Sequence, residues 1–110
     1  MKLTVGDAGE VKIVRIEGEL DTQTSPDAEA QLIQLIDAGA RKVVVNFERL
    51  AYISSAGLYI LLAAAKQLQV SGGELRLCSL SDLVREVFEM SGFDTIVSVS
   101  KNEAEALKGF

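Results

Sequence analysis

The chain has 110 residues, of which 48% are hydrophobic and 25% are charged, and its formal net charge at pH 7 is -5. This length and balance predict one globular domain over residues 1–110 and exclude an intrinsically disordered chain. The 11 Lys and Arg residues occur without a cluster that could follow a phosphate backbone, so we expect no direct binding of nucleic acid.

The chain begins with strand signals and continues into a helix. Residues 11–16 mix apolar with charged side chains in a pattern typical of a strand, and residues 3–5 can pair beside them across the turn sequence GDAGE, which predicts a β-hairpin. Ser25 and Pro26 are typical of an N-cap and a first helical residue. The helix is predicted to run up to Gly39, because its apolar residues form one stripe of Ala28, Leu32, Leu35 and Ile36.

A strand and a long helix follow. In the predicted strand at residues 43–47, Val43, Val44 and Val45 are apolar without alternation, which is typical of a central strand covered on both faces. Residues 55–70 form the clearest helix of the chain, with an apolar stripe of Leu58, Leu61, Leu62, Ala65 and Leu68.

The last third repeats the alternation. Residues 74–78 are a predicted strand, and Ser79 with Asp82 resembles a capping box at the start of a helix that ends at Gly92. The apolar residues of this helix are Leu80, Leu83, Val84, Val87 and Phe88. A short strand is expected at residues 96–99.

A final short helix, capped by Ser100 and Glu103, completes the prediction. Strands that alternate with helices predict an α/β fold with parallel strands and right-handed crossovers. We therefore expect one mixed sheet of four or five strands with about four helices.

The residues available for chemistry argue against an enzyme. The chain has no histidine, which removes the commonest general base and metal ligand, and it has no nucleotide-binding glycine motif. A nucleophile elbow is only half matched around Ser55, because Gly57 is present but Ile53 stands where the first glycine belongs. The single cysteine, Cys78, is expected to be a buried residue in a reducing compartment. We expect neither a cofactor nor a metal ion.

The junction between the central strand and the long helix leaves two interpretations open. Ser54 or Ser55 can cap the helix, while Ala56 and Gly57 keep its first turn slim enough to pack on the sheet. Alternatively, the outward side of this helix start is a docking surface, since Tyr59, Ile60, Ala63 and Ala64 are more apolar than a solvated face should be.

Three segments of the chain resemble the STAS domain family: GELDTQTSPDAEAQL, VVVNFERLAYISSAGLYILL and LRLCSLSDLVREVFEMSGFDTI. The most specific part is the pair GELD (18–21) and ISSAGL (53–58). Within the family, the chain is most similar to the stand-alone bacterial anti-sigma factor antagonists. An STAS-like α/β domain is therefore implied for the whole chain.

The resemblance implies a regulatory switch. The unphosphorylated domain would bind an anti-sigma factor that is also a serine kinase, phosphorylation of Ser55 would end the binding, and a serine phosphatase would reset the switch. The family's acidic residue at a strand end corresponds to Asp21, which we expect beside Ser55. The expected partner-binding surface consists of Asp21, Thr22, Ser54, Ser55, Ala56, Gly57, Tyr59 and Ile60.

Two positions depart from the family pattern. Ser54 and Asn46 stand where many members have aspartate. The loss of two carboxylates could change recognition by the kinase, and Ser54 becomes a competing phosphate acceptor. At Gly57 we expect a partner backbone or a neighbouring strand to approach closely, so that a larger side chain weakens partner binding more than stability.

The main alternative is an STAS subunit of a membrane ABC transporter for lipids, which would dock through the same helix without phosphorylation. The first ten residues hold no signal-peptide core, and the longest apolar run, LYILLAAA, is too short for a membrane span. We therefore expect a cytoplasmic protein. A small enzyme that uses Ser55 as a nucleophile lacks a base.

Overall fold

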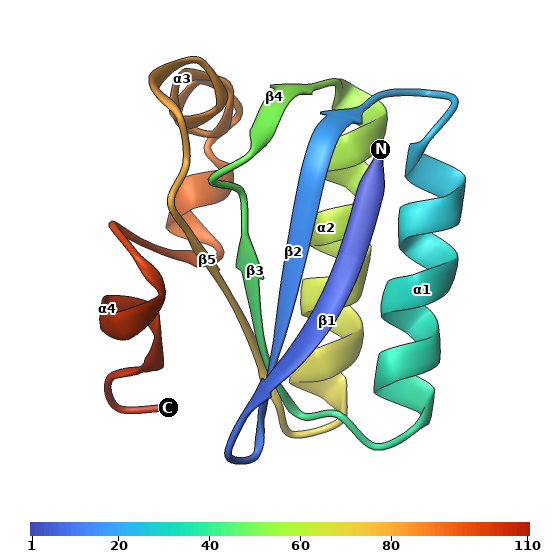
Figure 1. Cartoon of the computed structure of the whole chain (residues 1–110), viewed down its shortest axis with the longest axis vertical. Helices are drawn as coiled ribbons and strands as arrows, with labels where there is room; N and C mark the ends of the chain where they lie inside the picture. The colour runs from blue at the N-terminus through green and yellow to red at the C-terminus, as the bar shows by residue number, and fades with distance from the viewer.

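A six-stranded sheet runs through the centre of the computed structural model, which describes residues 1–110 (Figure 1). The elements in chain order are β1 (Lys2–Ala8), β2 (Val11–Leu20), α1 (Ser25–Asp37), β3 (Lys42–Asn46), β4 (Leu50–Ile53), α2 (Ser55–Val70), β5 (Glu74–Cys78), α3 (Asp82–Ser91), the 3-10 turn η1 (Phe93–Thr95), β6 (Ser98–Ser100) and α4 (Glu103–Leu107). None of the helices combines the length and the apolar character that crossing a membrane requires.

The sheet is mixed, as predicted, with the strand order β1-β2-β3-β5-β6. β1 pairs antiparallel with β2, and all other pairs are parallel. The strand that we did not predict is β4, which pairs with the last residues of β2 after a register shift between Gly18 and Glu19. β4 exists because β2, with ten residues, extends beyond the end of the five-residue β3.

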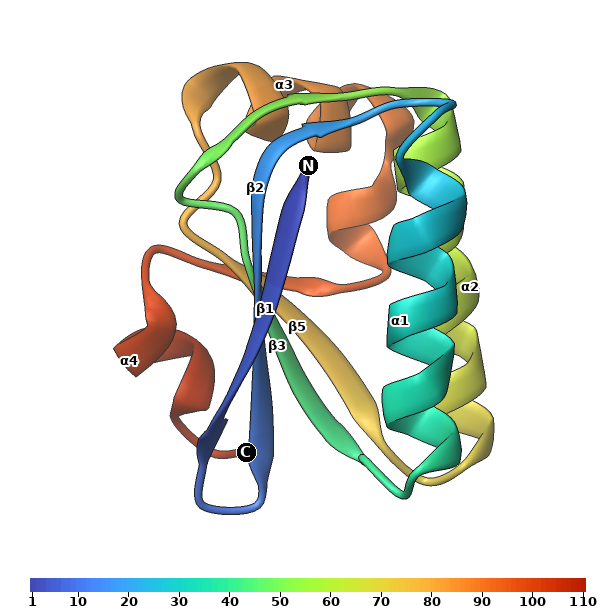
Figure 2. The same ribbon diagram turned by 45° about the vertical axis from the view of Figure 1, so that its right-hand side comes forward.

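The two faces of the sheet are covered unequally. α1 and α2 lie together on one face, the short α4 lies on the other, and α3 closes one end (Figure 2). The main core lies on the α1/α2 face, and its largest fully buried side chains include Phe47, Phe88, Ile16, Leu61 and Leu68. β3 is buried on both faces, as predicted, because Val43 and Val45 belong to this core and Val44 belongs to a second cluster under α4.

Several predicted helix ends are wrong by one or two residues. α3 is capped by Ser81, whose hydroxyl accepts a hydrogen bond from a helical N–H, and not by Ser79, whose φ of 61° still belongs to the loop. α4 is capped by Asn102 and not by Ser100, which is the last residue of β6. The end of α3 at Gly92 is confirmed, with a φ of 74° in the left-handed region that glycine tolerates.

Candidate functional site

The candidate site forms where two parallel strands end side by side. Leu20 at the end of β2 pairs with Ile53 at the end of β4, and the Ser54 N–H donates to the Leu20 carbonyl oxygen at 2.8 Å. Asp21 and Ser54 therefore leave the sheet at the same edge. α2 begins one residue later, so the structure brings the two predicted segments, GELD and ISSAGL, together.

Ser54 is the N-cap of α2. Its backbone is extended, and its hydroxyl oxygen accepts a hydrogen bond from the Gly57 N–H at 3.4 Å. Its carbonyl oxygen accepts the first helical hydrogen bond, from Leu58. The side chain is half-buried and caps the helix, as the first of the two interpretations of the sequence predicted.

Ser55 has the same side chain in a different environment. It is the first residue of α2, it is exposed, and its hydroxyl makes no hydrogen bond to the rest of the chain. The first turn of this 16-residue helix contains no acidic side chain. Free N–H groups and the positive end of the helix dipole therefore favour an anion at this position.

Gly57, one of the residues expected on the partner-binding surface, faces the interior. It is buried, and a Cβ atom built on it would lie 2.8 Å from Ile53 Cγ1 and 3.0 Å from Leu20 Cβ. The Leu20 carbonyl oxygen would be 3.1 Å away. The close neighbour of Gly57 is therefore the end of β2, and the residue allows α2 to start directly against the sheet.

Asp21 organises the turn between β2 and α1. Its Oδ1 accepts hydrogen bonds from the N–H groups of Gln23 and Thr24, both at 2.9 Å, and from the Thr24 hydroxyl at 3.2 Å. The hydrogen bond from the Thr24 N–H is the largest cause of the lowered pKa of Asp21. Burial opposes this shift, and the bond from the Gln23 N–H lowers the pKa by a smaller amount. No hydrogen bond joins Asp21 to Ser55, although their segments are adjacent.

A hollow of about 210 Å³ lies between the starts of α1 and α2, next to Ser55. It is lined by Thr22, Ser25, Pro26, Glu29, Ala56, Tyr59 and Ile60. Tyr59 is 66% exposed and forms part of the rim, as expected for a docking surface. The prediction that Ile60 lies on an outward face is wrong: it is only 5% exposed, because α1 packs on that side of α2.

Sequence reasoning missed the α1 side of this hollow, which Ser25, Pro26 and Glu29 supply. Ser25 was expected to be the N-cap of α1, but Thr24 occupies that position and Ser25 is the first helical residue. The Ser25 hydroxyl is buried without a hydrogen-bond partner. Pro26 could have indicated the correct N-cap, because a proline is compatible with the first or the second helical position, and the second position makes Thr24 the cap.

The arrangement places an exposed serine hydroxyl at a helix start, near a hollow in the surface. No group of three or more Asp, Glu or Cys side chains is arranged to hold a metal ion. An exposed serine hydroxyl at a helix start, beside a partly apolar hollow, is suited to modification and to contact with another protein.

Comparisons with known proteins agree with this geometry. The STAS domain model matches residues 3–106. BtrV of Bordetella bronchiseptica, provisionally named an anti-sigma factor antagonist, is 43% identical over 110 residues, which cover 100% of this chain and 95% of BtrV. The anti-sigma F factor antagonist of Paenibacillus polymyxa is 33% identical over 98 residues, 88% of this chain and 84% of that protein.

Solved structures extend the likeness to three dimensions. The anti-sigma factor antagonist SpoIIAA in its unphosphorylated form is 28% identical, with a TM-score of 0.83 over 96% of this chain and 93% of that chain. The phosphorylated form of SpoIIAA from Bacillus gives a TM-score of 0.75 over 96% of both chains. The sequence match over nearly the whole chain and the shared fold together show that this protein belongs to the STAS domain family, among the anti-sigma factor antagonists, which are non-enzymatic regulators.

Proposed function

We propose that this protein works as an anti-sigma factor antagonist by partner switching. In its unphosphorylated form it binds an anti-sigma factor that is also a serine kinase, and the sigma factor is released. Phosphorylation of Ser55 by that kinase ends the binding. A serine phosphatase restores the binding form, and all these steps take place in the cytoplasm.

The observation that carries the proposal is the difference between the two neighbouring serines. The Ser55 hydroxyl is exposed and has no partner in the chain, whereas the Ser54 hydroxyl caps α2. A kinase can reach Ser55 without breaking a hydrogen bond of the fold. This favours Ser55 as the acceptor, even though Ser54 stands where many family members carry aspartate.

The docking surface is the rim of the hollow beside Ser55. Thr22 and Tyr59 are exposed there, and Ala56, which follows Ser55 in the chain, also lines the hollow. A large exposed aromatic side chain at the edge of a concave surface is typical of the residues that dominate protein interfaces. A partner seated on Tyr59 would also cover Ser55, so that a phosphate there would fall inside the interface.

The effect of phosphorylation follows from two opposed energies. A phosphate adds about -1.5 to -2 charge, and the dipole of α2 stabilises it by roughly 0.3–1 kcal/mol, so the fold tolerates it. Burying the same charge under a partner without a matching cation costs several kcal/mol. The loss of binding therefore exceeds any change in the stability of the domain.

The test is capture of partners from a lysate of the source organism, with and without ATP, followed by mass spectrometry of the captured proteins and of the bait. We expect a kinase-type anti-sigma factor without ATP, and loss of that partner with a phosphate on Ser55 after ATP is added. Ser54→Ala should behave as the wild type, and Ser55→Ala should retain the partner with ATP present. Phosphate on Ser54 alone would contradict the assignment. A permease or its ATPase bound without phosphorylation would favour the transporter-subunit alternative.

A further inference from the structure

The face of the sheet opposite α1 and α2 has a separate small core. Alternate residues of β2, β3 and β5 point to this side, and the apolar ones are Val11, Ile13, Val44 and Cys78. Together with Ala106 of α4 they form a cluster of five buried residues that is distinct from the 22-residue main core. The sheet itself separates the two clusters.

A very small element covers this second cluster. α4 has five residues, which is too short for a helix that is stable without tertiary contacts. Its segment contributes one fully buried side chain, Ala106, with Leu107 and Phe110 partly buried around it. The position of the segment must therefore depend on other contacts.

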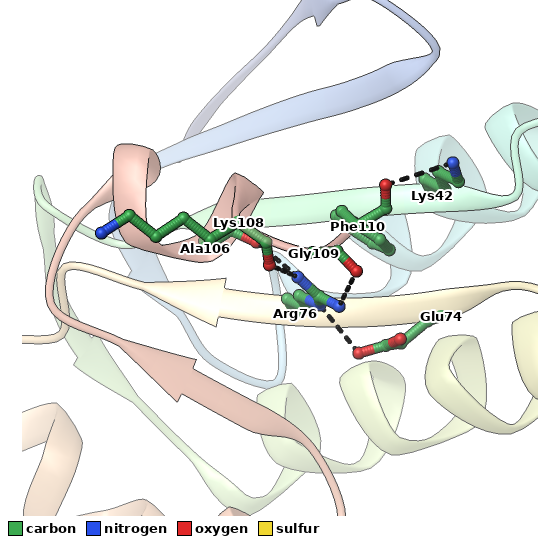
Figure 3. Close-up of polar contacts among 7 residues, drawn as sticks. All are labelled: Lys42, Glu74, Arg76, Ala106, Lys108, Gly109 and Phe110. Atoms are coloured by element: carbon green, nitrogen blue, oxygen red, sulfur yellow. Dashed lines mark hydrogen bonds and ion pairs between the residues drawn. The ribbon is translucent and has the colours of Figure 1, made fainter.

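Arg76 on β5 donates three hydrogen bonds to this segment (Figure 3). Its Nη1 and Nη2 donate hydrogen bonds of 2.9, 2.7 and 3.3 Å to the backbone oxygens of Ala106, Lys108 and Gly109. The Arg76 Cζ also lies 4.0 Å from the centroid of the Phe110 ring, and its Nε donates to Glu74 at 2.8 Å. Lys42 on β3 adds a hydrogen bond of 3.3 Å from its Nζ to the Phe110 carbonyl oxygen, so Arg76 and Lys42 together hold the end of the segment to the sheet (Figure 3).

Glu103 fixes the other end of the segment. Its carboxylate accepts two hydrogen bonds of 3.0 Å from Arg15 on β2 and one from the Asn46 amide on β3. Burial raises the pKa of Glu103, but the bonds from Arg15 and Asn46 outweigh it, so the net pKa is lowered and the carboxylate stays ionised. The segment is therefore held at both ends by polar, charge-assisted contacts.

We propose that residues 103–110, the α4 strap, open as a unit while the rest of the protein stays folded, and that opening exposes the apolar strip of Val11, Ile13, Val44 and Cys78. The strap shares no buried side chain with the main core, so its release leaves the packing of α1, α2 and α3 intact. The α4 strap has few buried apolar contacts and is held mainly by polar contacts near the surface. These are the properties of a segment of low local stability.

Cys78 allows a direct test, because it is the single cysteine and lies fully buried in the cluster that the strap covers. In the closed state burial also raises the pKa of its thiol, which slows labelling further. We expect the rate of DTNB labelling at low urea to depend only weakly on urea, because little surface is exposed by opening the strap. Global unfolding followed by circular dichroism should have a much steeper urea dependence.

Arg76→Gln should raise the labelling rate at low urea by about tenfold or more, because charge-assisted hydrogen bonds to the strap are lost. Arg49→Gln is the matched control, since Arg49 is 76% exposed and its ion pair with Glu17 is 4.0 Å long. Glu103→Gln provides a second, milder variant at the other end of the strap. Labelling that follows global unfolding at all urea concentrations, in the wild type and in Glu103→Gln, would overturn the proposal, as would equal acceleration by Arg49→Gln.

Discussion

Asp21 and Gly57 both belong to the surface that the family pattern assigns to a partner, yet each has an internal task in this structure. Asp21 holds the turn before α1 through three hydrogen bonds, and Gly57 gives α2 room against Leu20. Effects of their substitution on partner binding must therefore be separated from effects on folding.

Asp21→Ala should lower the melting temperature at pH 7, because the turn loses its acceptor. The lowered pKa of Asp21 stabilises the fold above the ordinary value of 3.8, and this contribution is lost as pH falls through the still lower folded value. The difference in melting temperature between wild type and variant should therefore shrink below pH 3.8. Thermal unfolding over a pH series measures it, with Glu86→Ala, an exposed residue of α3, as control. A constant difference at every pH would contradict this account.

Gly57→Leu should destabilise the fold by about 1–3 kcal/mol, since a larger side chain has to displace Ile53 and the end of β2. Urea unfolding measures the change, and Ala30→Leu on the exposed side of α1 should stay within about 0.5 kcal/mol of the wild type. A stable Gly57→Leu variant with impaired partner binding would return this residue to the docking surface.

The contact between Asn46 and Glu103 explains why asparagine, and not aspartate, stands at the end of β3. The Asn46 amide donates to Glu103, and its Oδ1 accepts from the Glu48 N–H at 2.7 Å, so Asn46→Asp would set two carboxylates against each other. We expect a loss of about 1–3 kcal/mol at pH 7. Because the pair then has a raised pKa, the loss should diminish as pH falls toward about 4.

Urea unfolding at several pH values measures this loss. Asn102→Asp is the matched control, because Asn102 is an exposed N-cap and aspartate caps equally well. An Asn46→Asp variant as stable as the wild type at pH 7 would argue against the contact with Glu103.

Among the secondary-structure elements, α2 and β3 were predictable and β4 was not. The pattern of Leu58, Leu61 and Leu68 has helical spacing over many residues, and the valines of β3 are apolar on both faces. β4 has only four residues and is defined by its pairing with β2. The sequence of a four-residue segment does not show which distant strand it pairs with. Serines near α3 offered several possible caps, and the backbone at Ser79 decided against the predicted one.

The sequence predicted those features of the candidate site that depend on neighbouring residues in the chain, but not those that depend on the packing of separate helices. Ser55, Thr22 and Tyr59 are exposed as expected, and GELD and ISSAGL do meet. The hollow between α1 and α2 was not predicted, because it depends on how two helices pack. The same packing buries Ile60, which helical spacing alone left on an outward face.

The start of α2 gives a prediction for an element. Ser54→Ala should lower the free energy of unfolding by about 0.5–1 kcal/mol, since its hydroxyl caps α2 through a long bond of 3.4 Å. Ser55→Ala should change it by less than about 0.5 kcal/mol, because this hydroxyl has no partner. Urea unfolding of both variants measures the two values. The reverse order would mean that Ser55 and not Ser54 is the cap.

In the whole molecule, the proposed switch and the small second core lie on opposite faces of the sheet. The α1/α2 side holds the main core and, at its edge, Ser55, the proposed phosphate acceptor, while the other side holds only the small cluster under α4. A charge added at Ser55 therefore meets solvent and the free N–H groups of α2, and no part of either core has to rearrange. This is the condition for a switch that changes binding without unfolding the domain.

The central claim is tested most directly by titrating the purified partner kinase with the unmodified chain and with the chain phosphorylated on Ser55. A loss of roughly 3 kcal/mol corresponds to more than a hundredfold weaker binding, and we expect at least this, with the free energy of unfolding nearly unchanged. Ser55→Asp should weaken binding less, because it adds a smaller charge. Equal affinity of the two forms, or phosphorylation that unfolds the domain, would contradict the proposed switch.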